Sequence, residues 1–118
     1  MKLESRELSG YLVFDVDGDF DSRSAGEAKE VIRSAILEGN YKVIINLENC
    51  TYIDSSGLGT LVSALKTTKE HGGTVWLSGL SAQVKMVVEL TRLHHVFDIF
   101  DTVEEAISEL DGSDVQEG

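Results

Sequence analysis

Lys42–Leu65 reads KVIINLENCTYIDSSGLGTLVSAL, and this segment decides the fold. Its first part, Lys42–Leu47, is a nearly continuous apolar run, which is typical of a strand buried in a parallel sheet. Its last part repeats leucine and valine at helical spacing from about Ser56 onward. Between them, Asp54 and Ser55 offer short oxygen side chains where the first N–H groups of a helix lack partners, so either one is a natural N-cap. The segment therefore predicts a strand, a capped turn and an amphipathic helix.

Two glycines stand in the first turns of this predicted helix. Gly57 and Gly59 each cost up to about 1 kcal/mol there relative to alanine, so we expect the bare backbone to leave room for another molecule. A phosphate on a hydroxyl at this helix start would bring roughly −1.5 to −2 charges to the positive end of the helix dipole. The same residue types are also the commonest helix caps. The turn alone therefore leaves both a plain capped helix and a charge switch open.

The segment resembles the signature of the anti-sigma factor antagonists, which are members of the sulphate transporter and anti-sigma antagonist (STAS) domain family. The similar runs are VIINL at 43–47 and YIDSSGLGTL at 52–61. Further stretches are similar to the family pattern: GDFD at 18–21, GG at 72–73 and TRLHHVF at 91–97. The resemblance covers about residues 8–110. It implies an α/β fold, a single STAS-like domain over residues 1–110 with a small mixed β-sheet and about four helices mostly on one face.

The resemblance also implies a phosphorylation switch. In the family, a partner that is both anti-sigma factor and serine kinase phosphorylates the serine directly after the motif aspartate, and a metal-dependent serine phosphatase reverses this. That serine is Ser55 here, and Ser56 is the second serine. The unphosphorylated form binds the anti-sigma factor and releases the sigma factor, while the phosphorylated form cannot bind. The residues that the resemblance implies for partner binding are Asp21, Asp54, Ser55, Ser56, Gly57 and Leu58.

Asp21 is carried over as a contact for the kinase or its nucleotide, and its plain alternative is an N-cap for the following helix. The ATP and metal of the phosphorylation belong to the partner. The chain itself is therefore expected to be a regulatory protein without a cofactor, not an enzyme.

The remaining pattern alternates strands and helices. We expect a hairpin that turns at Ser9-Gly10 and a small, acidic, disordered tail over residues 111–118. The other expected elements are strands at 3–8, 11–17, 74–78 and 96–100, and helices from 22 or 23 to 38, 56–71, 81–93 and 102–110.

The composition of the chain argues against several classes of function. With 118 residues and 42% apolar content, the chain suits one domain. The 10 basic and 21 acidic residues give a net charge of −11, which argues against direct nucleic-acid binding. No apolar run reaches membrane-spanning length and the N-terminus has no hydrophobic signal region, so we expect a cytoplasmic protein that does not contact a membrane.

Three other classes fit the sequence less well. Acidic residues alternate over 15–21, but Phe20 and Gly26 stand where a calcium-binding loop needs glycine and glutamate, so no metal site is expected. A response-regulator receiver would make Asp54 the phosphoacceptor, but that fold does not open with a hairpin. A serine hydrolase would need Gly-x-Ser-x-Gly and a nearby base. Within the family, a stressosome-like scaffold or regulatory module that binds a non-kinase target remains the alternative.

Overall fold

The computed structural model describes residues 1–116, with side chains up to Asp111. Its elements in chain order are β1 (Lys2–Leu8), β2 (Tyr11–Phe20), α1 (Ala25–Leu37), β3 (Lys42–Ile53), α2 (Ser55–Glu70), β4 (Thr74–Ser78), α3 (Ala82–Leu90), the 3-10 helix η1 (Leu93–His95), β5 (Ile99–Phe100) and α4 (Val103–Gln116). The strands form one sheet in the order β1-β2-β3-β4-β5. β1 is antiparallel to β2 and every other neighbouring pair is parallel, so the predicted mixed sheet is confirmed.

The chain opens with the predicted hairpin. Leu8 pairs with Tyr11, which leaves Ser9 and Gly10 as the two-residue turn. Both turn residues have positive φ, 54° and 88° respectively. A turn of this kind matches the right-handed twist of the two strands that it joins, and glycine suits its second position.

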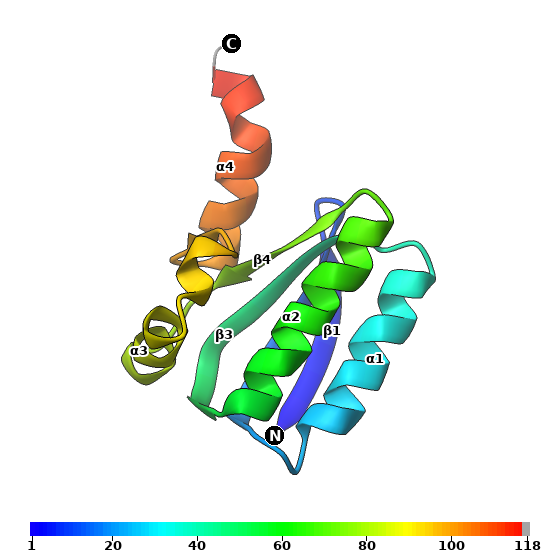
Figure 1. Ribbon diagram of the computed structural model, residues 1–118. Coiled ribbons are helices and arrows are strands. Elements are labelled where there is room, and N and C mark those ends of the chain that lie inside the picture. The colour runs from blue at the N-terminus through cyan, green and yellow to red at the C-terminus, as the bar shows by residue number, and fades with distance from the viewer. Residues whose placement is uncertain (117–118) are drawn as a thin grey trace.

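The central strand β3 is buried on both faces. Val43 and Ile45 belong to the core cluster that α1, α2 and α3 cover, and both are 0% exposed. Ile44 points to the opposite face and packs in a second cluster with Val103 and Ala106 of α4. Figure 1 shows α1 and α2 side by side over the first face. The prediction of four helices mostly on one face of the sheet is therefore confirmed.

The two central parallel strands run further than predicted. β2 continues to Phe20 instead of ending at residue 17, and β3 continues to Ile53 instead of 47. The pairing between them shifts register twice between Asp15 and Asp19. Such bulges interrupt the alternation of apolar and polar residues. The sequence pattern therefore fades although the strands continue.

The predicted boundaries after β4 were less accurate. α3 ends at Leu90 instead of 93, because Arg92 adopts a left-handed conformation with φ of 64° and η1 follows. β5 contains only Ile99–Phe100. α4 continues to Gln116, so the predicted helix end at 110 was wrong and helix occupies most of the segment for which disorder was predicted. Residues 117–118 of that predicted tail lie outside the described residues, and a domain limit at 110 stays a prediction.

α4 is joined to the sheet by a polar contact as well as by apolar packing. The Tyr11 hydroxyl donates a hydrogen bond of 2.7 Å to Asp111 Oδ1. The Tyr11 ring meets Trp76 edge to face, with centroids 5.7 Å apart. The last turns of α4 extend away from the sheet (Figure 1). Within residues 1–116 no helix, α4 included, combines the length and the apolar character needed to cross a membrane.

Candidate functional site

The candidate site lies where β2 and β3 end side by side. Phe20 and Ile53 are the last residues that pair between these two parallel strands. Directly beyond them, Asp54 N–H donates to the Phe20 carbonyl at 3.3 Å. The β2–α1 loop and the start of α2 therefore meet at the carboxyl edge of the sheet, where open α/β sheets commonly place their binding sites.

Asp54 holds these two segments together. It is the N-cap of α2, and its Oδ1 accepts hydrogen bonds from the backbone N–H groups of Ser56 at 2.9 Å and Gly57 at 3.2 Å. Its other oxygen, Oδ2, accepts from Ser22 N–H in the β2–α1 loop at 3.2 Å. Of the two possible caps, the structure uses Asp54. The carboxylate consequently fixes the helix start and the neighbouring loop at once.

Ser55 is the first residue of α2 and is exposed, whereas Ser56 is half-buried. Because Asp54 supplies the cap, the Ser55 side chain is not needed for that purpose. The first N–H groups of a helix create a positive partial charge, which favours an anion placed beside them. Ser55 is thus open to solvent and lies beside the end of α2 that favours a negative charge.

Gly57 and Gly59 have opposite surroundings. Gly57 is buried, and a Cβ placed on it would lie 2.7 Å from Cγ1 of Ile53 and 3.1 Å from the Phe20 ring. The close neighbour at Gly57 is therefore the chain itself, and the interpretation that this glycine leaves room for another molecule was wrong. Gly59 is exposed, with nothing within 4 Å of such a Cβ. Leu58 is 8% exposed and belongs to the core, so it offers a partner little surface.

Asp21 lies in the β2–α1 loop and forms a close ion pair with Arg23. Its Oδ2 is 2.6 Å from Arg23 Nη2, and its Oδ1 accepts from the Arg23 backbone N–H at 3.0 Å. The hydrogen bond from the Arg23 side chain holds the pKa of Asp21 below its ordinary value. α1 begins at Ala25 with Ser24 as its N-cap, so the alternative role of Asp21 as the N-cap was wrong.

Arg23 is the site residue that sequence reasoning missed. Its side chain is 79% exposed while that of Asp21 is 12% exposed, so an approaching protein meets the guanidinium before the carboxylate. The same guanidinium lies 3.9 Å from Asp19. An arginine two residues after an acidic loop residue was the available signal, but the pairing depends on the loop conformation.

The other acidic residues of the alternating run serve local contacts. Asp15 pairs with Arg6 at 2.8 Å and accepts from Asn46 at 2.8 Å. Asp19 accepts from the Thr51 hydroxyl at 2.7 Å. Among the described side chains, no three His, Cys, Asp or Glu residues gather in an arrangement that would hold a metal ion.

The chain resembles known proteins over nearly its whole length. A sequence model of the STAS domain matches residues 2–106. The anti-sigma-B factor antagonist of Staphylococcus aureus (strain NCTC 8325 / PS 47) is 26% identical over 104 residues, which cover 88% of this chain and 96% of that protein. The anti-sigma-B factor antagonist of Staphylococcus epidermidis is 29% identical with the same coverage.

Solved structures share the fold. The crystal structure of a putative anti-sigma factor antagonist from Thermotoga maritima matches with a TM-score of 0.86 and 25% identity, over 91% of this chain and 92% of that one. The anti-sigma factor antagonist SpoIIAA in its unphosphorylated form matches with a TM-score of 0.82 and 23% identity, over 94% and 97%. The phosphorylated form of SpoIIAA, a Bacillus cell fate determinant, matches with a TM-score of 0.75 and 22% identity, over 92% and 99%.

Proposed function

The chain belongs to the STAS domain family, and from this premise we propose that it is an anti-sigma factor antagonist switched by phosphorylation of Ser55. The unphosphorylated protein binds a kinase-type anti-sigma factor, and the sigma factor is released. Phosphorylation abolishes this binding, and the sigma factor is sequestered again. A metal-dependent serine phosphatase restores the binding form.

The observation that carries the proposal is the exposed Ser55 at the N-terminus of α2, directly after an aspartate that already caps the helix. Related proteins are named anti-sigma-B factor antagonists, and one structural neighbour was solved in a phosphorylated form. These names support the role, and the geometry of this chain supports the acceptor.

Charge explains how the modification would release the partner. The Ser55 Oγ forms a bond to the γ-phosphorus of the partner's ATP, the bond from that phosphorus to the β–γ bridging oxygen breaks, ADP leaves, and a base of the partner takes the hydroxyl proton. In the free protein the new phosphate lies at the favourable end of α2. In the complex it brings roughly −1.5 to −2 charges and extra bulk into a contact that also contains Asp54 and Asp21. A penalty of about 3 kcal/mol is enough to weaken binding more than a hundredfold.

Each remaining residue of the site has a place in this proposal. Asp54 fixes the helix start that presents Ser55, and the half-buried Ser56 contributes backbone at the contact edge. Asp21, covered by Arg23, lies in the adjoining loop as a contact for the kinase or its nucleotide. Gly57 and Leu58 are buried and contribute indirectly, because they pack the start of α2 against the sheet. The chain itself touches no nucleic acid, and it works in the cytoplasm with the sigma factor.

The test uses wild type, Ser55→Ala, Ser55→Asp and, as a matched control, Ser56→Ala as baits in lysate of the native organism. Mass spectrometry then identifies the retained proteins. We expect wild type, Ser55→Ala and Ser56→Ala to retain a kinase-fold anti-sigma factor, and Ser55→Asp to lose it. Only wild type and Ser56→Ala should incorporate phosphate from ATP with the retained kinase.

Equal retention of one non-kinase protein by all four baits would contradict the proposed phosphorylation switch. It would favour the alternative function, a scaffold or regulatory module. Phosphate incorporation into Ser55→Ala would show that the acceptor had been assigned to the wrong residue.

A further inference from the structure

One face of α2 points away from the core along the entire helix. Its exposed residues are spaced four, three, four and three positions apart, which places them in one row. We name this row the α2 stripe, and it consists of Ser55, Gly59, Val62, Lys66 and Lys69. Glu70, also exposed, lies about 100° further around the helix axis. The stripe therefore starts at the proposed phosphorylation site and continues to the other end of the helix.

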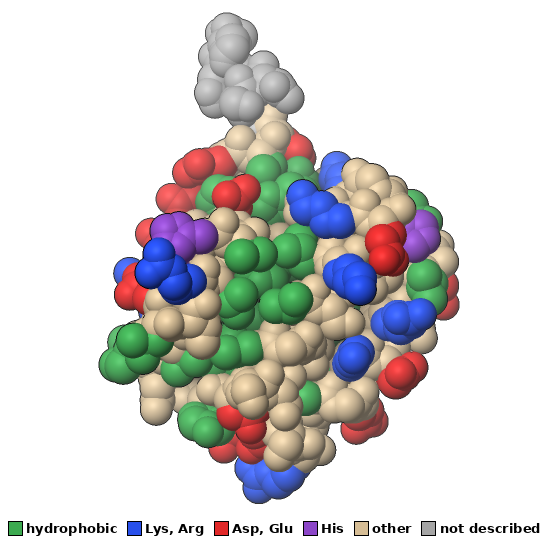
Figure 2. All heavy atoms as spheres, viewed as in Figure 1, with side chains coloured by type: hydrophobic (Ala, Val, Ile, Leu, Met, Phe, Trp, Pro, Cys, Tyr) green, Lys and Arg blue, Asp and Glu red, His purple; other side chains and the backbone are tan. Residues whose placement is uncertain are grey.

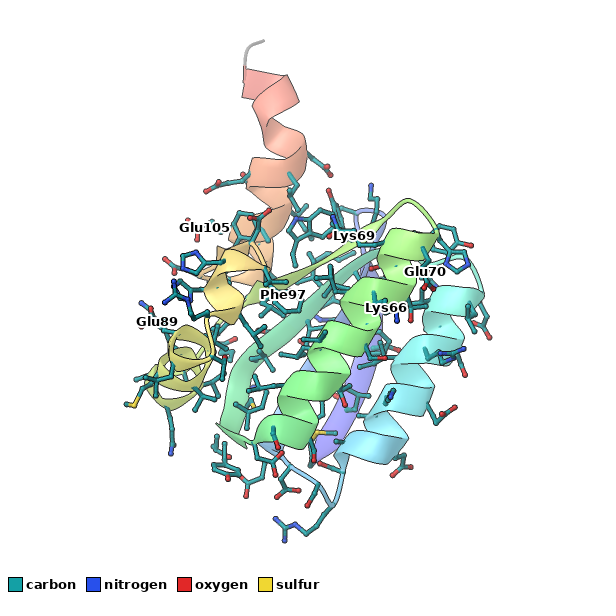
Figure 3. All side chains as sticks on the ribbon, viewed as in Figure 1. Lys66, Lys69, Glu70, Glu89, Phe97 and Glu105 are labelled. Atoms are coloured by element: carbon teal, nitrogen blue, oxygen red, sulfur yellow. The ribbon has the colours of Figure 1, made fainter. Side chains whose placement is uncertain are left out.

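The side chains of the α2 stripe change along the helix: they are small at its start, apolar at Val62 and basic at its end. Gly59 leaves open space above the backbone, and Val62 is 41% exposed. Figure 2 shows further hydrophobic side chains gathered beside α2, on the side that faces α3 and η1. Figure 3 shows Lys66 and Lys69 along the outer part of α2. A surface with this order can contact both an apolar and an acidic group of one partner.

The two lysines are free to pair with another molecule. The ion pairs among the described side chains involve Lys2, Arg6 and Arg23, and no described carboxylate lies within 4.0 Å of Lys66 or Lys69. The whole chain has a net charge of −11. Lys29 and Arg33 on α1 are likewise exposed and outside these ion pairs, but only Lys66 and Lys69 lie in the same row as Ser55. Two neighbouring cations of this kind complement an acidic surface.

We propose that the α2 stripe is a second contact surface for the anti-sigma kinase, which presents an apolar side chain to Gly59 and Val62 and an acidic patch to Lys66 and Lys69. This inference rests on the proposed function, because Ser55 begins the same row. At a rise of about 1.5 Å per residue, the lysines lie about 16 and about 21 Å from Ser55 along the helix axis. The acidic patch thus fixes the direction of α2 across the kinase and places Ser55 at its active site.

The closing experiment measures binding by calorimetry with the anti-sigma kinase that the Ser55→Ala bait identifies, produced in pure form. The test variant is Lys66→Glu/Lys69→Glu. The matched control is Lys29→Glu/Arg33→Glu, which makes the same charge change at two exposed residues of α1. We expect the test variant to bind at least tenfold more weakly and the control to stay within twofold of wild type. Unfolding curves of both variants confirm that each is folded.

A second variant tests the apolar half of the stripe. Gly59→Gln adds a side chain where the structure leaves open space. The variant should therefore fold normally, but it should bind the kinase at least tenfold more weakly than wild type. Affinities within twofold of wild type for both stripe variants would overturn the inference and leave the proposed function intact, provided that Ser55→Asp still abolishes binding. An equal loss in the α1 control would also overturn it, because net charge would then explain the effect.

Light scattering tests whether a second copy of the chain, instead of the kinase, binds the α2 stripe. If wild type is a dimer that Lys66→Glu/Lys69→Glu converts to a monomer with unchanged kinase affinity, the stripe belongs to a second copy of the chain and the inference is wrong. If folded wild type binds no anti-sigma factor at all, the proposed function fails and the inference fails with it.

Discussion

At the scale of single residues, Gly57 and Gly59 show how two identical residues in one helix differ in what they tolerate. Gly57→Ala brings a methyl group against Ile53 and Phe20, so we expect a loss of about 1–3 kcal/mol in the free energy of unfolding. Gly59→Ala meets no neighbour and lowers the entropy of the unfolded chain, so we expect a gain of up to about 1 kcal/mol. Urea denaturation measures both. Equal effects would contradict the packing described for Gly57.

The Asp21–Arg23 ion pair predicts that the stability of the folded protein depends on pH in the acidic range. The pKa of Asp21 is lowered in the folded protein, chiefly by the hydrogen bond from Arg23. The pairing therefore adds stability above the ordinary aspartate pKa of about 3.9, and this contribution is lost as the pH falls through the lower folded-state value. An NMR titration of the Asp21 carboxyl carbon should show a midpoint below that of a model peptide. Arg23→Gln should move the midpoint upward.

Arg33→Gln is the control for this titration, since it removes a guanidinium from an exposed position on α1. A shift of the Asp21 midpoint in this control as large as in Arg23→Gln would mean that net charge, and not the pair, lowers the pKa.

The residues of the site were predictable to different degrees. Ser55 and Asp54 follow a strand and open a helix within one short segment, so sequence placed both correctly at the helix start. The burial of Gly57 depends on Phe20, which is distant in the sequence, and no local pattern reports such a contact. The ion pair of Arg23 depends on a loop conformation. Local chemistry was therefore readable, while tertiary contacts required the fold.

At the scale of elements, helix α4 is held to the sheet by apolar packing and by one hydrogen bond that sequence periodicity does not show. Burial, followed by the hydrogen bond to Asp111, raises the pKa of Tyr11 to about 12. Because this value lies above the ordinary pKa of about 10, the contact stabilises the protein fully below that pH and is lost as the pH rises through the folded-state value. We expect α4 to loosen from the sheet in that alkaline range.

Tyr11→Phe tests this contact directly. The variant keeps the aromatic packing on Trp76 and removes the hydroxyl, so we expect a loss of about 1 kcal/mol in the free energy of unfolding. Amide hydrogen exchange should quicken in α4 and stay unchanged in α1 and α2. Unchanged exchange in α4 would contradict a stabilising role for the bond.

The elements themselves were predicted best where periodicity is unbroken. α1 and α2 each bury one face against the sheet, and both helices end close to their predicted limits. β2 and β3 continue through register shifts that conceal their alternation. β5 pairs with β4 through only two residues, Ile99 and Phe100, which is too short a strand for alternation to mark its limits. Regular packing leaves a signal in the sequence, and irregular pairing does not.

At the scale of the whole molecule, the net charge of −11 predicts a salt effect on stability. Repulsion among the acidic side chains destabilises the compact state, and salt screens it. Raising NaCl from about 20 mM to about 500 mM should raise the Tm by roughly 2–5 °C, as followed by circular dichroism. Lys29→Glu/Arg33→Glu changes the net charge from −11 to −15 and should show a larger rise. A Tm that falls with salt in both proteins would contradict this expectation.

The division of α2 into a buried face and the α2 stripe also bears on how duplicated genes diverge. Substitutions on the buried face are limited by folding in every cell, whatever partner is present. Lys66 and Lys69 form no ion pair among the described side chains, so their exchange leaves the core intact. Two descendants of one ancestor can therefore keep the same acceptor serine and the same fold while a few outward substitutions insulate their signalling pathways from crosstalk.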